Sequence, residues 1–299
     1  MYETFYSFRE KPFSLLPDPA FLFLARQHST ALAVLEYGLV NQAGFTVVTG
    51  EIGCGKTTLI RHVLNTLGQD ITVGLLSNTQ RGELLQWVLM AFGLDYRGKE
   101  KVALYETFLE FIIDEYAKNR RTVLIIDEAQ NLGVDALEEL RMLSNVNADK
   151  DQVLQLILVG QPELRATLSR PGLIQFAQRV AVDYFLVPLE SEQIGSYIRH
   201  RLEIAGGDPA LFKPEACQLV YHHSEGIPRL INLLCDTALV YGYAAGKQEI
   251  DVELVREVVQ DKAGSLLFAR GRKLSVSASE ADWGHITAER ELPYGKDCR

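Results

Sequence analysis

The chain has 299 residues and a net charge of −9, and 47% of its residues are hydrophobic. This length favours about two domains, and the acidic balance argues against a dominant nucleic-acid-binding surface. No apolar stretch approaches the roughly 18 residues of a membrane span, and residues 1–19 lack the basic and then apolar order of a signal peptide.

A strand, a glycine-rich loop and a helix are predicted after an aromatic and proline-bearing segment over residues 1–40. Residues 45–49 are apolar and β-branched, and residues 58–67 place their apolar side chains on one helical face. The loop between them has the spacing of a phosphate-binding loop, in which backbone N–H groups and the helix dipole favour an anion. The predicted nucleotide-binding residues are Gly50, Glu51, Ile52, Gly53, Cys54, Gly55, Lys56, Thr57 and Thr58.

Two acidic residues end a second apolar run, residues 122–126. Adjacent carboxylates at the end of a core strand are costly unless a cation pairs with them, and Mg²⁺ is the obvious partner. We predict that Asp127 and Thr57 hold Mg²⁺ and that Lys56 contacts the β and γ phosphates of ATP. Glu128 is predicted to orient and activate the water that attacks the γ-phosphate.

The spacing between these two motifs leaves room for one additional strand. We therefore expect an α/β P-loop fold with a five-stranded parallel sheet. An inserted strand, together with a glutamate directly after the metal-binding aspartate, resembles the additional-strand branch of P-loop ATPases to which AAA+ proteins belong. The remaining predicted strands and helices of this region cover residues 71–76, 83–92, 104–118, 153–160 and 182–187.

The AAA+ resemblance implies roles for further polar residues. Gln161 follows the strand after the Asp-Glu strand, where these proteins have a residue that senses the γ-phosphate. Arg179 precedes the fifth strand and resembles the arginine finger that acts on a neighbouring subunit, with Arg165 and Arg170 as competing choices. Arg229 matches the second sensor arginine of the lid. The resemblance therefore implies a homo-oligomer.

From Ser191 onward the pattern predicts helices alone, over residues 191–205, 213–224, 227–243 and 251–262. This region resembles the small helical lid of an AAA+ module. Beyond it, periodicity is lost and a basic cluster is followed by serine, glutamate and glycine. The expected domains are the N-terminal segment 1–40, the nucleotide-binding domain 41–190, the helical lid domain 191–262 and a disordered tail 263–299.

Several motifs resemble the secretion ATPases related to general secretion pathway protein A, most closely the branch associated with exosortase and exopolysaccharide export loci. The resemblance covers residues 1–259 and implies an ATPase that serves an export system through protein partners. Its implied location is the cytoplasm or the cytoplasmic surface of the inner membrane, as a peripheral protein. General secretion pathway protein A continues into a membrane helix and a peptidoglycan-binding region, which this sequence does not show. The motifs are Lys11-Pro12-Phe13, Pro17-Asp18-Pro19, Asp127-Glu128-Ala129-Gln130, Gly160-Gln161-Pro162-Glu163 and Gly226-Ile227-Pro228-Arg229.

Two alternatives remain open at this point. Transposition regulators similar to TniB and MuB share the module and polymerise on DNA, although the acidic balance and the aromatic N-terminal segment favour the secretion group. A scaffold that binds ATP but hydrolyses it negligibly is the other. The four cysteines are scattered without metal or redox spacing, which indicates a reduced, cytoplasmic setting.

Overall fold

The computed structural model describes residues 1–77, 83–148 and 151–262. The chain divides into two units, Met1–Asp261 and Lys262–Arg299. All elements below belong to the first unit, apart from the last residue of the final helix. The tail predicted over residues 263–299 lies outside the described residues.

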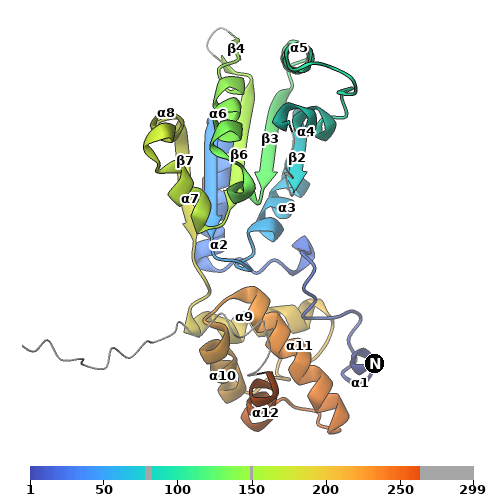
Figure 1. The fold of residues 1–299 in the computed structure, drawn as a ribbon. Coiled ribbons are helices and arrows are strands. Elements are labelled where there is room, and N and C mark those ends of the chain that lie inside the picture. Colours follow the sequence, from blue (N-terminus) through green and yellow to red (C-terminus); the bar gives the residue numbers. More distant parts are fainter. Residues whose placement is uncertain (78–82, 149–150, 263–299) are drawn as a thin grey trace, which may run out of the picture. The chain divides into compact units, whose positions relative to one another are not determined.

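A five-stranded sheet forms the centre of this unit (Figure 1). Its strands stand in the order β2-β3-β6-β1-β7, and all neighbouring pairs are parallel, which confirms the predicted sheet. The inserted strand β2 lies at the edge, beside β3. The strands are β1 (Phe45–Gly50), β2 (Ile71–Ser77), β3 (Arg121–Asp127), β6 (Leu154–Gly160) and β7 (Val180–Leu186), with a short antiparallel pair β4 (Asn147–Ala148) and β5 (Asp151–Gln152).

Helices cover both faces of the sheet, which explains why its central strands are mostly apolar. In β3, Leu124 and Ile126 belong to one buried cluster, whereas Val123 and Ile125 belong to the other. The first cluster includes residues of α4 (Leu84–Ala91), α5 (Lys101–Ala117), α6 (Val134–Leu143), η3 (Pro171–Leu173), α7 (Pro162–Leu168) and α8 (Ile174–Ala177). The second includes residues of α2 (Arg26–Val40) and α3 (Lys56–Thr66).

The region after β7 is helical, as predicted for the lid. A capping box formed by Glu190 and Gln193 starts its first helix, and Pro228 occupies the first turn of its third. Gly226 is required between them, because it has a φ of 75° and a Cβ there would lie 1.9 Å from the carbonyl oxygen of Leu189. The helices are α9 (Ser191–Ile204), α10 (Pro214–Ser224), α11 (Pro228–Ala244) and α12 (Val252–Lys262).

The N-terminal segment packs against the lid, which the sequence did not predict (Figure 1). The Tyr2 hydroxyl donates a hydrogen bond to Asp236, 234 residues away. The Tyr6 hydroxyl donates to the carbonyl oxygen of Lys247 at 3.0 Å, and burial raises the pKa of Tyr6 to about 12. The elements of this segment are α1 (Tyr2–Phe5) and η1 (Pro19–Phe21).

Arg201 of α9 fastens the same segment to the lid. Its side chain is buried, and its Nε donates to the carbonyl oxygen of Pro12. Its guanidinium carbon lies 4.7 Å from the centre of the Phe21 ring, within the range of a cation–π contact. Arg201 therefore holds both ends of the stretch from Pro12 to Phe21 against the lid.

We expect Arg201→Ala to lower the free energy of unfolding by about 2–4 kcal/mol, because a buried carbonyl loses its donor and the ring loses its cation. Urea denaturation followed by circular dichroism measures this change. Arg256→Ala, at an exposed arginine of α12, is the matched control. Equal losses in the two variants would contradict the role given to Arg201.

Candidate functional site

The loop between β1 and α3 has the backbone conformation of a phosphate-binding loop. Gly53 and Gly55 have φ angles of 85° and 94°, which side chains other than glycine rarely adopt. A Cβ on Gly53 would also lie 2.6 Å from the Cβ of Arg229 in the lid. Helix α3 begins at Lys56, so the N–H groups of its first turn face the loop.

Lys56 places one buried cation inside this loop. Its Nζ donates to the carbonyl oxygens of Gly50 and Glu51 at 2.7 and 2.9 Å. Burial lowers the pKa of the ammonium group, and the nearby carboxylates of Asp127 and Glu128 act in the opposite direction. The ammonium is therefore already withdrawn from bulk water and bonded to the loop backbone.

The two predicted metal ligands meet at the start of α3. The Thr57 hydroxyl donates to Asp127 Oδ2 at 2.7 Å, although the residues are 70 positions apart. Oxygen donors of this kind suit Mg²⁺, which is commonly held by few protein groups while phosphates and water complete its coordination. In the described ranges no group of three or more histidine, cysteine, aspartate or glutamate residues could form a separate metal centre.

A small amide network surrounds Glu128. This residue follows β3 with a left-handed φ of 56°, and its Oε2 accepts hydrogen bonds from the side-chain amides of Gln130 and Gln161. The side-chain oxygen of Gln130, Oε1, in turn accepts a hydrogen bond from the backbone N–H of Gln161 at 3.0 Å. Gln130 therefore joins the end of β3 to the end of β6, through the turn η2 (Ala129–Asn131).

Gln130 was not among the predicted site residues. The available signal was an amide two residues after Glu128, between the buried side chains of Ala129 and Leu132. Whether such an amide turns back to the strand depends on the left-handed backbone at Glu128, which sequence alone did not indicate.

His28 contacts the loop from α2. Its Nε2 lies 3.0 Å from the carbonyl oxygen of Cys54, and burial lowers the pKa of the ring. A neutral imidazole facing a carbonyl oxygen must carry its hydrogen on Nε2. The Cys54 thiol points into the core, where burial raises its pKa to about 11, so only the backbone of Cys54 faces the site.

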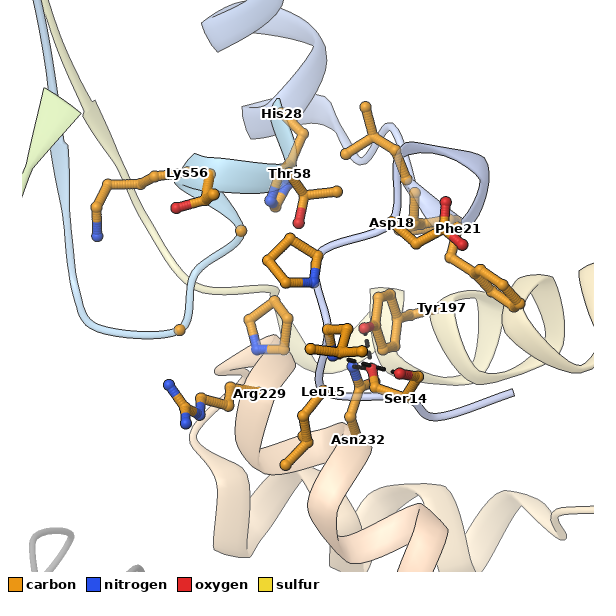
Figure 2. Close-up of a pocket in the computed structure, with 18 of the residues that line it drawn as sticks. Ser14, Leu15, Asp18, Phe21, His28, Lys56, Thr58, Tyr197, Arg229 and Asn232 are labelled. Atoms are coloured by element: carbon orange, nitrogen blue, oxygen red, sulfur yellow. Dashed lines mark hydrogen bonds between the residues drawn. The ribbon is translucent and has the colours of Figure 1, made fainter. Parts of the chain in front are cut away.

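A pocket brings together the loop, the strand ends, the lid and the N-terminal segment (Figure 2). Its lid side is ordered by Asn232, which accepts the Tyr197 hydroxyl at 2.8 Å and donates to the carbonyl oxygen of Ser14 at 3.4 Å. Apolar residues of the N-terminal segment also line the pocket, although none of them was predicted to be a site residue. They are Leu15, Leu16, Pro17, Phe21 and Leu22. The predicted residues that line the pocket are Ile52, Gly53, Gly55, Lys56, Thr57, Thr58, Glu128, Gln161 and Arg229.

Four predicted residues contribute without lining the pocket. Gly50 and Glu51 supply the carbonyl oxygens that hold Lys56, Cys54 accepts from His28, and Asp127 is reached through Thr57. Each is thus one contact away from the pocket.

Arg229 connects the lid to the loop. Its backbone N–H donates to the carbonyl oxygen of Gly53 at 3.2 Å. Its guanidinium is exposed and has no hydrogen-bond or ion-pair partner within the described part of the chain. This geometry leaves a cation at the mouth of the pocket (Figure 2).

Arg179 lies outside the pocket. Its Nη1 donates to Ser144 Oγ at 2.9 Å, beside the end of α6. The next residue, Val180, pairs with Phe45 at the start of β1, whereas the phosphate loop follows the end of that strand. At about 3.3 Å per strand residue, Arg179 is on the order of 20 Å from its own loop.

Comparison with known proteins identifies the domain. A family model described as "AAA domain" matches residues 40–168, which include the phosphate loop, Asp127, Glu128 and Gln161. General secretion pathway protein A of Aeromonas hydrophila is 39% identical over 254 residues, or 84% of this chain. Residues 40–168 therefore carry an AAA domain, and most of the chain is similar to general secretion pathway protein A.

The chain spans less than half the length of the curated relatives it matches. It covers 46% of general secretion pathway protein A. It covers 38% of an uncharacterized HTH-type transcriptional regulator of Methanocaldococcus jannaschii, which is 25% identical over 52% of this chain. In the part of the chain that the structure describes, no helix has the length and apolar character to cross a membrane.

Solved structures agree with the fold. The ORC2 protein of Aeropyrum pernix has a TM-score of 0.65 at 18% identity, with 85% of this chain and 72% of that chain covered. Domain III of the replication initiation protein DnaA from Thermotoga maritima has a TM-score of 0.56 at 22% identity, covering 83% and 98%. At these identities the likeness concerns the fold alone.

Proposed function

We propose that this protein binds ATP with Mg²⁺ and hydrolyses it. The observation that carries the proposal is the division of work between the two acidic residues at the end of β3. Asp127 bonds to Thr57 on the phosphate-loop helix, whereas Glu128 turns the other way to the amides at the end of β6. Asp127 would thus be free to hold the metal while its neighbour Glu128 activates water.

The rest of the pocket offers surfaces for both the triphosphate and the base of a nucleotide. The triphosphate would follow residues 50–58, where N–H groups and Lys56 favour an anion. The apolar side chains of Leu15, Phe21 and Pro228 offer a surface for the base. Arg229 would meet the phosphates from the lid.

In this proposal Glu128 accepts the proton of the attacking water. Thr57 and Asp127 would hold Mg²⁺, which supplies charge neutralisation to the phosphates when bound. Glu128 Oε2 is already fixed by two amides, which leaves Oε1 to accept a hydrogen bond from water. Gln161, bonded to the same carboxylate, would contact the γ-phosphate.

Phosphate release from the purified full-length chain tests the proposal. We expect turnover with ATP and Mg²⁺ and none with excess EDTA. Glu128→Gln protein prepared in the same way reports contaminating ATPases. Equal release from the wild type and the variant would contradict a role for this site.

We expect Gln130→Ala to lower kcat between about ten- and a hundredfold with little change in KM, because the carboxylate of Glu128 loses one of the groups that position it. Steady-state phosphate release measures both constants. Gln86→Ala, on α4 and outside the pocket, is the control. A rise in KM at unchanged kcat would place Gln130 in substrate binding instead.

We propose that Arg179 acts on the site of a neighbouring subunit, because it lies too far from its own loop. Arg179→Ala should lose activity, and mixing it with Glu128→Gln should restore part of it, since mixed assemblies pair an intact loop with an intact arginine. Phosphate release against mixing ratio measures this rescue. Arg256→Ala, which breaks an exposed ion pair with Glu253 on α12, is the control. No rescue with intact binding would exclude action between subunits.

We further propose that ATP hydrolysis serves a secretion or exopolysaccharide export system through protein partners, with the protein cytoplasmic or peripheral at the inner membrane. The similarity to general secretion pathway protein A over most of this chain supports this role. That relative does not favour the transposition alternative. Because the chain covers less than half of it, the role remains a proposal about this AAA+ region.

Deletion of the gene from its host tests the cellular role. We expect reduced export of protein or polysaccharide, restored by the wild type and not by Glu128→Gln. Filter binding with duplex DNA at physiological salt tests the transposition alternative. ATP-dependent DNA retention with normal export would overturn the proposed role.

A further inference from the structure

A second cavity lies in the lid between α9 and α10. Its volume is about 440 Å³, enough for a few side chains. Helix α9 places Tyr197 and Arg201 in the nucleotide pocket, whereas Gly195 and Arg199 line this cavity. Because residues two positions apart on a helix point in nearly opposite directions, the two sites lie on opposite sides of α9. We call the second site the lid groove.

The floor of the lid groove is apolar. Ile198, Phe212 and Cys217 line it and are buried or nearly so. Burial raises the pKa of the Cys217 thiol to about 11, so the thiol is protonated and behaves as a small apolar group at neutral pH. A Cβ on Gly195 would have no atom within 4 Å, so the helix surface there is open.

The one unpaired side-chain charge among the residues that line the lid groove is positive. Arg199 is exposed and has no hydrogen-bond or ion-pair partner in the ranges that the structure describes, while Lys213 forms an ion pair with Glu249 at 2.7 Å. The residues lining the lid groove include these two cations and no aspartate or glutamate. Electrostatic complementarity therefore favours an anionic occupant.

We propose that the lid groove docks an acidic segment of a partner protein. An apolar side chain of that segment would pack against the exposed Pro209, Ala210 and Pro214 above this buried floor, and a carboxylate beside it would pair with Arg199. A second copy of this chain is a poorer occupant, because a two-fold contact through this surface would bring its Arg199 and Lys213 cations together. The inference concerns a surface outside the nucleotide site and does not depend on ATP hydrolysis.

Selection from a library of random 12-residue peptides tests this proposal with the full-length chain as target. Gly195→Leu places a side chain in the lid groove, where its Cβ would have no atom within 4 Å, and replaces a poor helix former, so the lid should stay folded. Gly195→Ala is the matched control, and an unchanged circular dichroism spectrum confirms that each variant is folded. We expect enriched peptides that combine an apolar residue with aspartate or glutamate and that bind wild type and Gly195→Ala but not Gly195→Leu.

Fluorescence anisotropy then measures the affinity of the selected peptides. Arg199→Glu should weaken binding at least about tenfold, and Arg256→Glu on α12 should not. The proposal is overturned by peptides that bind Gly195→Leu as tightly as the wild type, by selection of basic sequences, or by a failure to enrich any groove-dependent peptide. Self-association that Gly195→Leu abolishes would instead make a second copy the occupant and would equally reject an acidic partner segment.

Discussion

Glu128→Gln is expected to bind ATP as tightly as the wild type and to hydrolyse it about 10²- to 10⁴-fold more slowly. The amide keeps the size of the side chain but cannot accept the proton of the attacking water. Gln130 and Gln161 can still bond to the new carbonyl oxygen, so the network around the residue should survive. Single-turnover hydrolysis with excess enzyme measures the chemical step separately from product release.

Glu163→Gln is the control for this substitution, since Glu163 is an exposed acid in the first turn of α7. Nucleotide affinity, measured by calorimetry, should be the same for wild type and both variants. Retained single-turnover hydrolysis in Glu128→Gln would remove this carboxylate from the reaction and make the protein a nucleotide-binding scaffold.

Lys56→Ala should have the second large effect, at the level of binding. Its ammonium is the one side-chain cation that the structure places inside residues 50–57, and charge-assisted hydrogen bonds contribute about 1.5–3 kcal/mol each. We therefore expect ATP affinity to fall about ten- to a hundredfold, with hydrolysis lost at cellular ATP concentrations. Calorimetric titration of the variant with ATP and Mg²⁺ measures the affinity.

Two further variants serve as controls, one at Lys56 that separates charge from shape and one at a distant lysine. Lys56→Arg keeps the charge, but the guanidinium fork does not fit carbonyl oxygens arranged for a compact ammonium, so affinity should stay low. Lys118→Ala, at the exposed end of α5, should bind as the wild type does. Wild-type affinity in Lys56→Ala would show that the nucleotide does not occupy this loop.

The sheet and the phosphate loop could be predicted because their signals are local. Strands buried on both faces are mostly apolar, as in β3 and β6, and the loop requires glycine at the positions with positive φ. Asp127 and Glu128 were found because charge at the end of such a strand is conspicuous. The fold class followed from the order of these elements.

The remaining parts of the site depend on contacts between distant positions. The N-terminal segment meets a lid that is about 200 residues away in sequence, as the 189-residue separation of Pro12 and Arg201 illustrates. No periodicity indicates such a contact. Gln130 and His28 enter the site only because η2 turns back to β6 and α2 packs beside the loop, so their roles follow from tertiary structure.

A crystal structure of Glu128→Gln protein with ATP and Mg²⁺ tests the central claim most directly. The proposed function predicts the triphosphate along residues 50–57, Mg²⁺ at Thr57, and the base against Leu15 and Phe21. It also predicts Gln161 and Arg229 within reach of the phosphates. Nucleotide bound elsewhere, or a loop at residues 50–57 that contacts no phosphate at saturating ATP, would contradict it.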